Sequence, residues 1–209
     1  MEDEVNRLKR KLILEVASRL FYERGYSGTS MEAIAEELGA TKPFLYYYFQ
    51  SKADILAEVC GTTVESVADL AESTLQSADA CTQRLSRLVR SLTLTVIEGR
   101  VDLSVYFREE KDLPKEAFRK LKQNRRRFEK AVAALLAAGA ASGEFAVTDF
   151  AFTARAIAGM TTWLFTWYRA HGPNSPEQIA DQMEGLVMSM VCAGKPGGRL
   201  VKPLELSAP

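Results

Sequence analysis

Apolar residues recur at intervals of three and four positions along almost the whole chain, which is the spacing of one face of an α-helix. Asn-Gly and Asp-Gly hairpin turns are absent, and no segment keeps a sustained alternation of apolar and polar residues. The pattern therefore predicts an all-α protein with about nine helices. The first is expected to run to about residue 24, with an apolar stripe made of Val5, Leu8, Leu12, Val16 and Leu20, widened by Ile13, Ala17 and Phe21.

Glycine and capping residues indicate where the first helix ends and the second begins. Gly25 follows the first apolar run and is suited to a left-handed C-cap, with Tyr26 folding back as its hydrophobic partner. Thr29 and Glu32 have the spacing of a capping box. These signals predict a long helix, a turn and a short helix that ends near Gly39.

A third short helix is expected directly after this one. Thr41 can cap it, and Pro43 would stand in its first turn, where a missing N–H costs little. The helix is expected to continue through Tyr48. Ser51 and Asp54 form a further capping pair, which opens a long fourth helix toward about residue 77. Five more helices are expected over about residues 79–98, 101–109, 114–141, 148–170 and 176–192.

The segment TSMEAIAEELGATKPFLYYYFQSK, residues 29–52, predicts a helix-turn-helix, in which the second short helix lies in the major groove. Thr41 offers a hydroxyl at the amino end of that helix, and Lys42 can reach a guanine edge or a phosphate. The tyrosines at 46–48 point at successive angles round the helix, so at least one presents its hydroxyl outward. The candidate DNA-contacting residues are Thr29, Ser30, Thr41, Lys42, Pro43, Phe44, Tyr46, Tyr47 and Lys52.

Charge and cysteine content narrow the classes of function. The 209 residues carry 27 basic and 27 acidic side chains, so any DNA contact must come from a local patch. The three cysteines are widely spaced and odd in number, which argues against a disulfide framework or a zinc site. We expect no cofactor and no metal. The amino-terminal segment is not a signal peptide, and no stretch of about 18 apolar residues exists, so we expect a cytoplasmic protein without membrane contact.

The helix-turn-helix segment and its flanks resemble the DNA-binding domain of the TetR family of repressors. The resemblance covers about residues 8–58 and is carried by Leu20-Phe21, Gly25-Tyr26, Thr29-Ser30, Ile34-Ala35, Leu38-Gly39, Leu45-Tyr46, Tyr48-Phe49 and Ser51-Lys52. It implies homodimers whose last two helices form a four-helix bundle, with a ligand pocket in each C-terminal domain. It also implies DNA contacts from Thr41, Lys42, Pro43, Tyr46, Tyr47 and Lys52. Phe44 departs from the family pattern, in which a small or polar residue is more usual.

The C-terminal helices carry more apolar surface than one face can bury. The segment TARAIAGMTTWLFTWYRAHG is apolar around much of its circumference, and such a helix must be covered on both sides. A second subunit is the simplest cover, and the amphipathic last helix would complete a two-fold bundle. A fully buried monomer core is the alternative.

Nine basic residues lie between positions 111 and 130, opposed by only three acidic ones. They form either a solvated helix face or a site for an anionic ligand. The segments YFREEKDLPKEAFRK and TTWLFTWYRAHGPNSPEQIADQM resemble the TetR branch that senses acyl-CoA thioesters in lipid or sterol catabolism. That resemblance implies an acyl-CoA effector, its acyl part among aromatic side chains and its phosphates near the arginines at 119–127. The candidate ligand-binding residues are Phe107, Arg125, Phe128, Trp163, Phe165 and Trp167.

An enzyme is not expected, because no GxSxG, GxGxxG, P-loop or HExxH motif is present and the single histidine, His171, lies beside a turn. The sequence instead predicts a ligand-responsive transcriptional regulator, by family habit a repressor, that binds a pseudo-palindromic operator as a dimer. A TetR-type regulator of an efflux pump that senses a hydrophobic drug-like compound is the alternative. The expected divisions are a helix-turn-helix domain over 1–52, a helical ligand-binding and dimerisation domain over 53–193 and a flexible tail over 194–209.

Overall fold

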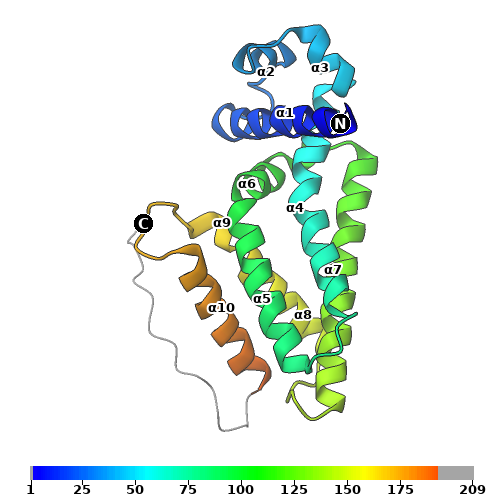
Figure 1. Ribbon diagram of the computed structural model, residues 1–209, viewed down its shortest axis with the longest axis vertical. Helices are drawn as coiled ribbons and strands as arrows, with labels where there is room; N and C mark the ends of the chain where they lie inside the picture. Colours follow the sequence, from blue (N-terminus) through cyan, green and yellow to red (C-terminus); the bar gives the residue numbers. More distant parts are fainter. Residues whose placement is uncertain (1, 193–209) are drawn as a thin grey trace. The chain divides into compact units, whose positions relative to one another are not determined.

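The computed structural model describes residues 2–192, and every regular element within that range is helical (Figure 1). The all-α expectation is therefore confirmed for the described residues. The tail expected over 194–209 lies outside them. The α-helices are α1 (Glu2–Arg24), α2 (Met31–Glu37), α3 (Lys42–Tyr48), α4 (Lys52–Thr74), α5 (Cys81–Glu98), α6 (Arg100–Glu109), α7 (Lys115–Ala141), α8 (Phe150–Thr162), α9 (Leu164–Trp167) and α10 (Pro176–Val191).

The described chain divides into two compact units. The first contains the residues up to Val64 together with Val101–Lys122, and the second contains Glu65–Arg100 together with the described residues from Gln123 onward. Helices α4, α6 and α7 therefore each have residues in both units. The expected borders of the DNA-binding domain at residue 52 and of the ligand-binding domain at residue 193 stay predictions. The division into compact units does not test them.

The core of the first unit combines one face of each of α1 to α4 with residues of α6. These side chains are apolar and almost completely buried, which gives the short helices α2 and α3 the tertiary support that seven-residue helices need. Among them are Ile13, Ala17, Leu20, Phe21, Ile34, Leu45, Phe49, Ile55, Leu56 and Val105.

The apolar stripe predicted for α1 is wrong in its first three members. Val5, Leu8 and Leu12 are exposed to 42%, 60% and 52%, whereas Ile13, Ala17, Leu20 and Phe21 are buried in the core. The inward positions in the first turns belong instead to polar groups, since Arg10 contacts Tyr48 and Phe49 of the helix-turn-helix. The helical spacing of apolar residues predicted the helix correctly. In its first turns, however, the face of α1 that packs on the core is not its most apolar face.

In the second unit α5 packs along α10 and also contacts α8 and α9; Figure 1 shows α5 and α10 side by side. Leu85, Leu92 and Val96 of α5 are buried, as is Val187 of α10. An ion pair between Arg90 and Asp181 joins the two helices at the surface. No helix within residues 2–192 combines the length and apolar character needed to cross a bilayer.

The single helix expected over 148–170 is two helices, because the chain breaks between α8 and α9 at Trp163. Two threonines near the break direct their hydroxyls to the backbone. Thr161 donates to the Ile157 carbonyl at 2.8 Å, and Thr166 donates to the Trp163 carbonyl at 2.8 Å. Such bonds compete with the helical ladder and bend helices, which apolar periodicity alone does not reveal.

Candidate nucleic-acid interface

A tight turn joins α2 to α3 and builds the helix-turn-helix. Gly39 adopts a left-handed φ of 62°, and the amide of Ala40 donates to the Ala35 carbonyl at 2.9 Å. These contacts end α2 after Glu37 and turn the chain toward Thr41, the N-cap of α3. The stop at Gly39 and the cap position at Thr41 are both as the sequence predicts.

Helix α3 presents its amino-terminal half and two of its tyrosines to solvent. Thr41, Lys42 and Pro43 are exposed, and the Thr41 side chain makes no capping hydrogen bond, which leaves its hydroxyl available. Tyr46 and Tyr47 are exposed to 46% and 74%. The surface of α3 that we call the recognition surface consists of Thr41, Lys42, Pro43, Tyr46 and Tyr47.

Lys42 lies in an exposed ion pair with Glu32 of α2. This pair lowers the pKa of the Glu32 carboxyl below its usual value, since the ammonium group favours the charged carboxylate. The Lys42 ammonium nitrogen is also 5.9 Å from the centre of the Tyr46 ring. Because exposed ion pairs contribute little free energy, Lys42 can exchange Glu32 for a phosphate or a base edge at small cost.

Two aromatic residues of α3 support the surface from inside. Phe44 is half-buried against the core, and its ring centre is 5.1 Å from that of Tyr48. The Tyr48 hydroxyl donates to Asn6 of α1 at 3.1 Å. Phe44 was a candidate for a base contact, and its packing assigns most of its surface to the interior instead.

Thr29 is the candidate that the structure removes from the DNA-facing set. Its side chain is 1% exposed, and its hydroxyl donates to the carbonyls of Gly25 at 2.9 Å and Leu20 at 3.3 Å. The N-cap of α2 is Ser30, which accepts from the Ala33 amide at 3.1 Å, so the expected Thr29–Glu32 capping box is wrong and the cap lies one residue later. Ser30 itself is exposed and keeps its place among the candidates.

Lys52 is half-buried and directs its ammonium group inward. It donates to the carbonyls of Tyr26 at 2.8 Å and Thr29 at 2.7 Å. The DNA contact predicted for Lys52 is therefore in competition with two hydrogen bonds inside the first unit.

The sequence reasoning missed a pair at the end of α6. Glu109 is 7% exposed and accepts from the Tyr26 amide at 3.2 Å and from Arg108 at 2.8 Å. Arg108 also donates to the carbonyls of Phe21 and Tyr22, the latter at 3.0 Å. The pair thus binds backbone groups at the carboxyl end of α1 and in the turn after it, where the Phe21 carbonyl also accepts from the Gly25 amide at 3.0 Å. No local signal could reveal it, because the partners are more than 80 residues apart.

The candidate ligand-binding residues differ in burial. Phe107 belongs to the first unit and is 47% exposed; the other five belong to the second. Phe128 is 7% exposed, whereas Trp163 and Trp167 are exposed to 61% and 40%. The ring centres of Trp163 and Phe165 are 5.9 Å apart. The set therefore includes both core and surface aromatic groups.

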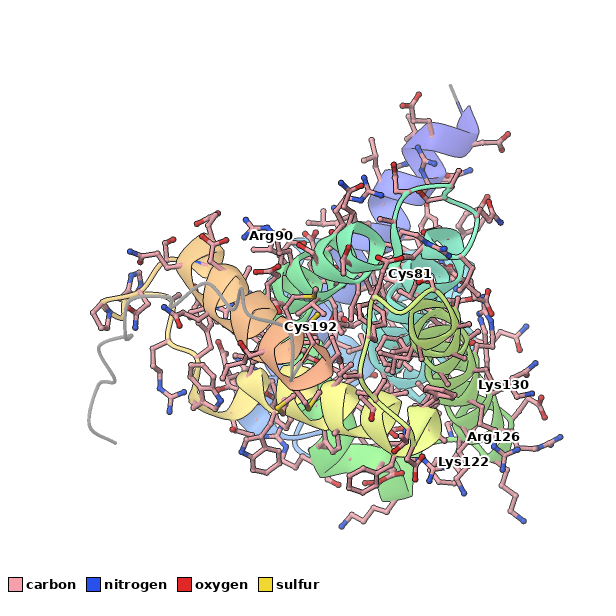
Figure 2. All side chains as sticks on the ribbon, turned by 90° about the horizontal axis from the view of Figure 1, so that it is seen from below. Cys81, Arg90, Lys122, Arg126, Lys130 and Cys192 are labelled. Carbon is pink, nitrogen blue, oxygen red and sulfur yellow. The ribbon has the colours of Figure 1, made fainter. Side chains whose placement is uncertain are left out.

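The basic residues of α7 are divided between ion pairs and solvent. Arg127 binds the carboxylates of Asp69 at 2.6 Å and Glu72 at 2.6 Å, and Arg119 binds Glu116 at 2.5 Å. The carboxylates raise the pKa of Arg127 above its ordinary value. Arg125 is exposed, and Figure 2 shows Arg126 and Lys130 pointing away from α7. The interpretation of this segment as a solvated helix face thus holds for Arg125, Arg126 and Lys130.

The short helices joined by a tight turn, with an exposed aromatic and basic second helix, define a DNA-binding regulator of the helix-turn-helix class. A model of the tetR family of bacterial regulatory proteins matches residues 13–59, and a model of the tetracyclin repressor-like C-terminal domain matches residues 78–191. The chain belongs to the TetR family of transcriptional regulators. Since members of this family are DNA-binding transcription factors, the expectation that the chain is not an enzyme is confirmed.

Relatives and solved structures extend the match over most of the chain. The HTH-type transcriptional repressor KstR2 of Mycolicibacterium smegmatis is 27% identical over 185 residues, covering 86% of this chain and 89% of that protein. PfmR from Thermus thermophilus has a TM-score of 0.77 at 31% identity and covers 84% of this chain and 96% of its own. AibR, crystallised with isovaleryl coenzyme A and operator DNA, has a TM-score of 0.72 at 26% identity, with coverages of 88% and 97%.

Proposed function

We propose that this chain is a repressor that binds a pseudo-palindromic operator as a dimer and is released by a small-molecule effector. The observation that carries the proposal is the recognition surface of α3, where two exposed tyrosines, a threonine hydroxyl, a proline and a lysine stand together. The hydroxyl and ammonium groups suit phosphates and base edges, and Pro43 suits a thymine methyl. A protein of this kind acts on DNA in the cytoplasm.

The dimer is supported by apolar side chains that the second unit leaves in solvent. Phe152 and Trp163, within and at the end of α8, are exposed to 69% and 61%; Leu186 and Met190 of α10 are exposed to 60% and 37%. Exposed apolar surface spread along two neighbouring helices is typical of a subunit interface. A two-fold bundle of α8 and α10 with the same helices of a second subunit would cover it. Two recognition helices would then be held at a fixed spacing for successive major grooves.

The effector that we propose is an acyl-CoA thioester. One finding supports this class: the likeness to AibR, which was crystallised with isovaleryl coenzyme A. Within the second unit, Phe128 and Phe165 offer aromatic surface for an acyl chain, and Arg125 is a cation for a phosphate. Arg119 and Arg127 are weaker candidates than the sequence suggested, because carboxylates already bind them.

The proposed switch acts through α4, which has residues in both units. An effector that binds one arrangement of this helix more tightly shifts the population toward it and changes the spacing of the two recognition helices. The coupling free energy expected for such a device is about 1–3 kcal/mol, or roughly 5- to 150-fold in DNA affinity.

The experiment is fluorescence anisotropy with DNA from the promoter of the protein's own gene, repeated with a panel of CoA thioesters. The proposal expects saturable binding that a CoA thioester weakens and free CoA does not. DNA binding that responds to hydrophobic drug-like compounds but to no thioester would replace the effector class by that of an efflux-pump regulator. Absence of DNA binding under all these conditions would remove the proposed function.

A further inference from the structure

The guanidinium group of Arg10 joins three helices of the first unit. Its Nε donates to Glu58 of α4 at 2.8 Å, and a second nitrogen donates to the other oxygen of the same carboxylate. A third nitrogen donates to the carbonyl of Tyr48 at 2.7 Å. The guanidinium carbon also lies 4.0 Å from the centre of the Phe49 ring. One side chain of α1 thus binds the start of α4 and the end of α3.

The contact with Tyr48 lies where α3 needs a partner. Tyr48 is the last residue of α3, and Phe49 is its extended C-cap, so the Tyr48 carbonyl has no helical donor. A cation at this end of a helix is also favoured by the helix dipole. Phe49 is 2% exposed and anchors the chain in the core immediately after the helix. Arg10 therefore fixes the carboxyl end of the helix whose amino end carries the recognition surface.

The geometry separates Arg10 from the other basic residues at the start of α1. Arg7 and Lys9 are exposed, and as free surface cations they could bind a phosphate. Three of the five N–H groups that an arginine offers are already used within the protein. Moving Arg10 to a phosphate would leave the Glu58 carboxylate and the Tyr48 carbonyl without this partner.

We infer that Arg10 is a positioning residue for DNA binding, which sets the orientation of α3 against α1 and α4 and does not itself contact DNA. This inference rests on the proposed function, since it concerns how tightly the recognition surface binds an operator. It assigns Arg10 a role different from that of a phosphate anchor, which its place in the basic start of α1 would otherwise suggest.

Direct phosphate binding by Arg10 and positioning of α3 by Arg10 predict opposite effects of one substitution on DNA affinity. Glu58→Gln removes a negative charge near the DNA-binding helices, so a purely electrostatic role for the pair predicts stronger DNA binding. Positioning predicts weaker binding, because the fork that orients Arg10 is lost. Arg10→Lys gives a second contrast, since a lysine keeps the charge for a phosphate but cannot bind a carboxylate and a carbonyl in the same fork.

The test compares Arg10→Gln, Arg10→Lys and Glu58→Gln with Arg7→Gln, an exposed control with the same loss of charge. Operator affinity is measured at several salt concentrations in the full-length protein. We expect all three test variants to bind about tenfold more weakly or worse, with a salt dependence equal to that of the unmodified protein. A salt slope reduced by about 0.9 in Arg10→Gln, or full rescue by Arg10→Lys, would overturn the inference.

Hydrogen exchange of the protein without DNA tests the positioning of α3 separately from operator binding. The amide of Phe49 donates to the Leu45 carbonyl at 2.9 Å, and its hydrogen exchange reports on the carboxyl end of α3. We expect faster exchange at residues 45–49 in Glu58→Gln and Arg10→Lys than in Arg7→Gln. Equal exchange in all variants would reject positioning, whether or not an operator has been found.

Discussion

The ammonium group of Lys52 lies 4.1 Å from the centre of the Tyr26 ring and donates a hydrogen bond of 2.8 Å to the carbonyl of the same residue. A second bond of 2.7 Å reaches the carbonyl of Thr29. Lys52 begins α4, while Tyr26 and Thr29 lie in the turn between α1 and α2. In the same turn, Glu109 accepts from the Tyr26 amide at 3.2 Å. The turn that precedes the helix-turn-helix is thus held by a cation of α4 and a carboxylate of α6.

Substitution of Lys52 by methionine should lower the free energy of unfolding by about 1–3 kcal/mol, because two backbone carbonyls lose a charged donor. Urea unfolding measures the change. Lys9→Met is the control, since Lys9 is exposed on α1, and it should change stability by no more than about 0.5 kcal/mol. If Lys52→Met left stability unchanged and reduced the salt slope of DNA binding, direct contact of Lys52 with a DNA phosphate would be the better description.

Tyr47→Ala should weaken operator binding by about 1–3 kcal/mol while leaving the unfolding free energy within about 0.5 kcal/mol of its original value. Tyr47 is 74% exposed on α3, so its removal takes little from the core. Tyr22→Ala is a matched control, because Tyr22 is also an exposed tyrosine of the first unit but lies on α1. Anisotropy and urea unfolding on the same samples separate the two effects. Equal losses of affinity in both variants would argue against the recognition surface.

The fold was predictable where local chemistry decides it. Gly25 adopts the left-handed conformation that the sequence predicted, with φ of 78°, and Gly39 ends α2 as expected, with φ of 62°. Ser51 accepts from the Asp54 amide as a capping residue should. The failures have tertiary causes. The choice of Ser30 over Thr29 as the cap of α2 depends on Thr29 being drawn into the core by the carbonyls of Leu20 and Gly25.

The candidate interface was predictable as a segment but not residue by residue. The helical spacing predicted that at least one of the tyrosines at 46–48 faces outward, and the TetR resemblance singled out Tyr46 and Tyr47, which are exposed in the structure. It could not show that Arg10 and Lys52 turn inward, because a basic residue on a helix has the same signature whether it binds DNA or a distant carbonyl. Contacts 38 and 26 residues apart decide the matter here.

Glu144→Gln should destabilise the second unit at neutral pH and progressively less in acid. The Glu144 carboxylate accepts from the Thr82 amide at 2.8 Å and from its hydroxyl at 3.0 Å, at the start of α5. These bonds lower the pKa of Glu144 to about 2. A carboxyl whose pKa is depressed on folding stabilises the protein above its unfolded pKa and loses that contribution as pH falls through the folded pKa.

Urea unfolding at pH 7, 4 and 3 tests this dependence on Glu144. The stability difference between the unmodified protein and Glu144→Gln should shrink over this range, as the pH falls below the ordinary carboxyl pKa toward 2. The effect should be smaller than the pKa change alone implies, because solvent screens this partly exposed group. Glu177→Gln offers a comparison at the start of α10, where the pKa is lowered chiefly by Ser175. If the stability difference between the unmodified protein and Glu144→Gln stayed constant with pH, the effect would come from the packing of the side chain and not from its charge.

Cys60 should be inert toward alkylating reagents in the folded protein. Its side chain is 1% exposed in α4, and burial, with a further contribution from Asp102 and Glu109, raises the pKa of its thiol to about 12. The thiolate is the reactive form, and at pH 8 a thiol of this pKa is ionised in only about one molecule in 10⁴.

In a variant that keeps Cys60 and replaces Cys81 and Cys192 by serine, modification by iodoacetamide at pH 8 should therefore require unfolding. The rate should rise with urea in parallel with the unfolded fraction, whereas a variant that keeps only the half-buried Cys192 should react at low urea. Rapid modification of Cys60 without urea would mean that the core between α1, α4 and α6 opens far more often than its burial indicates.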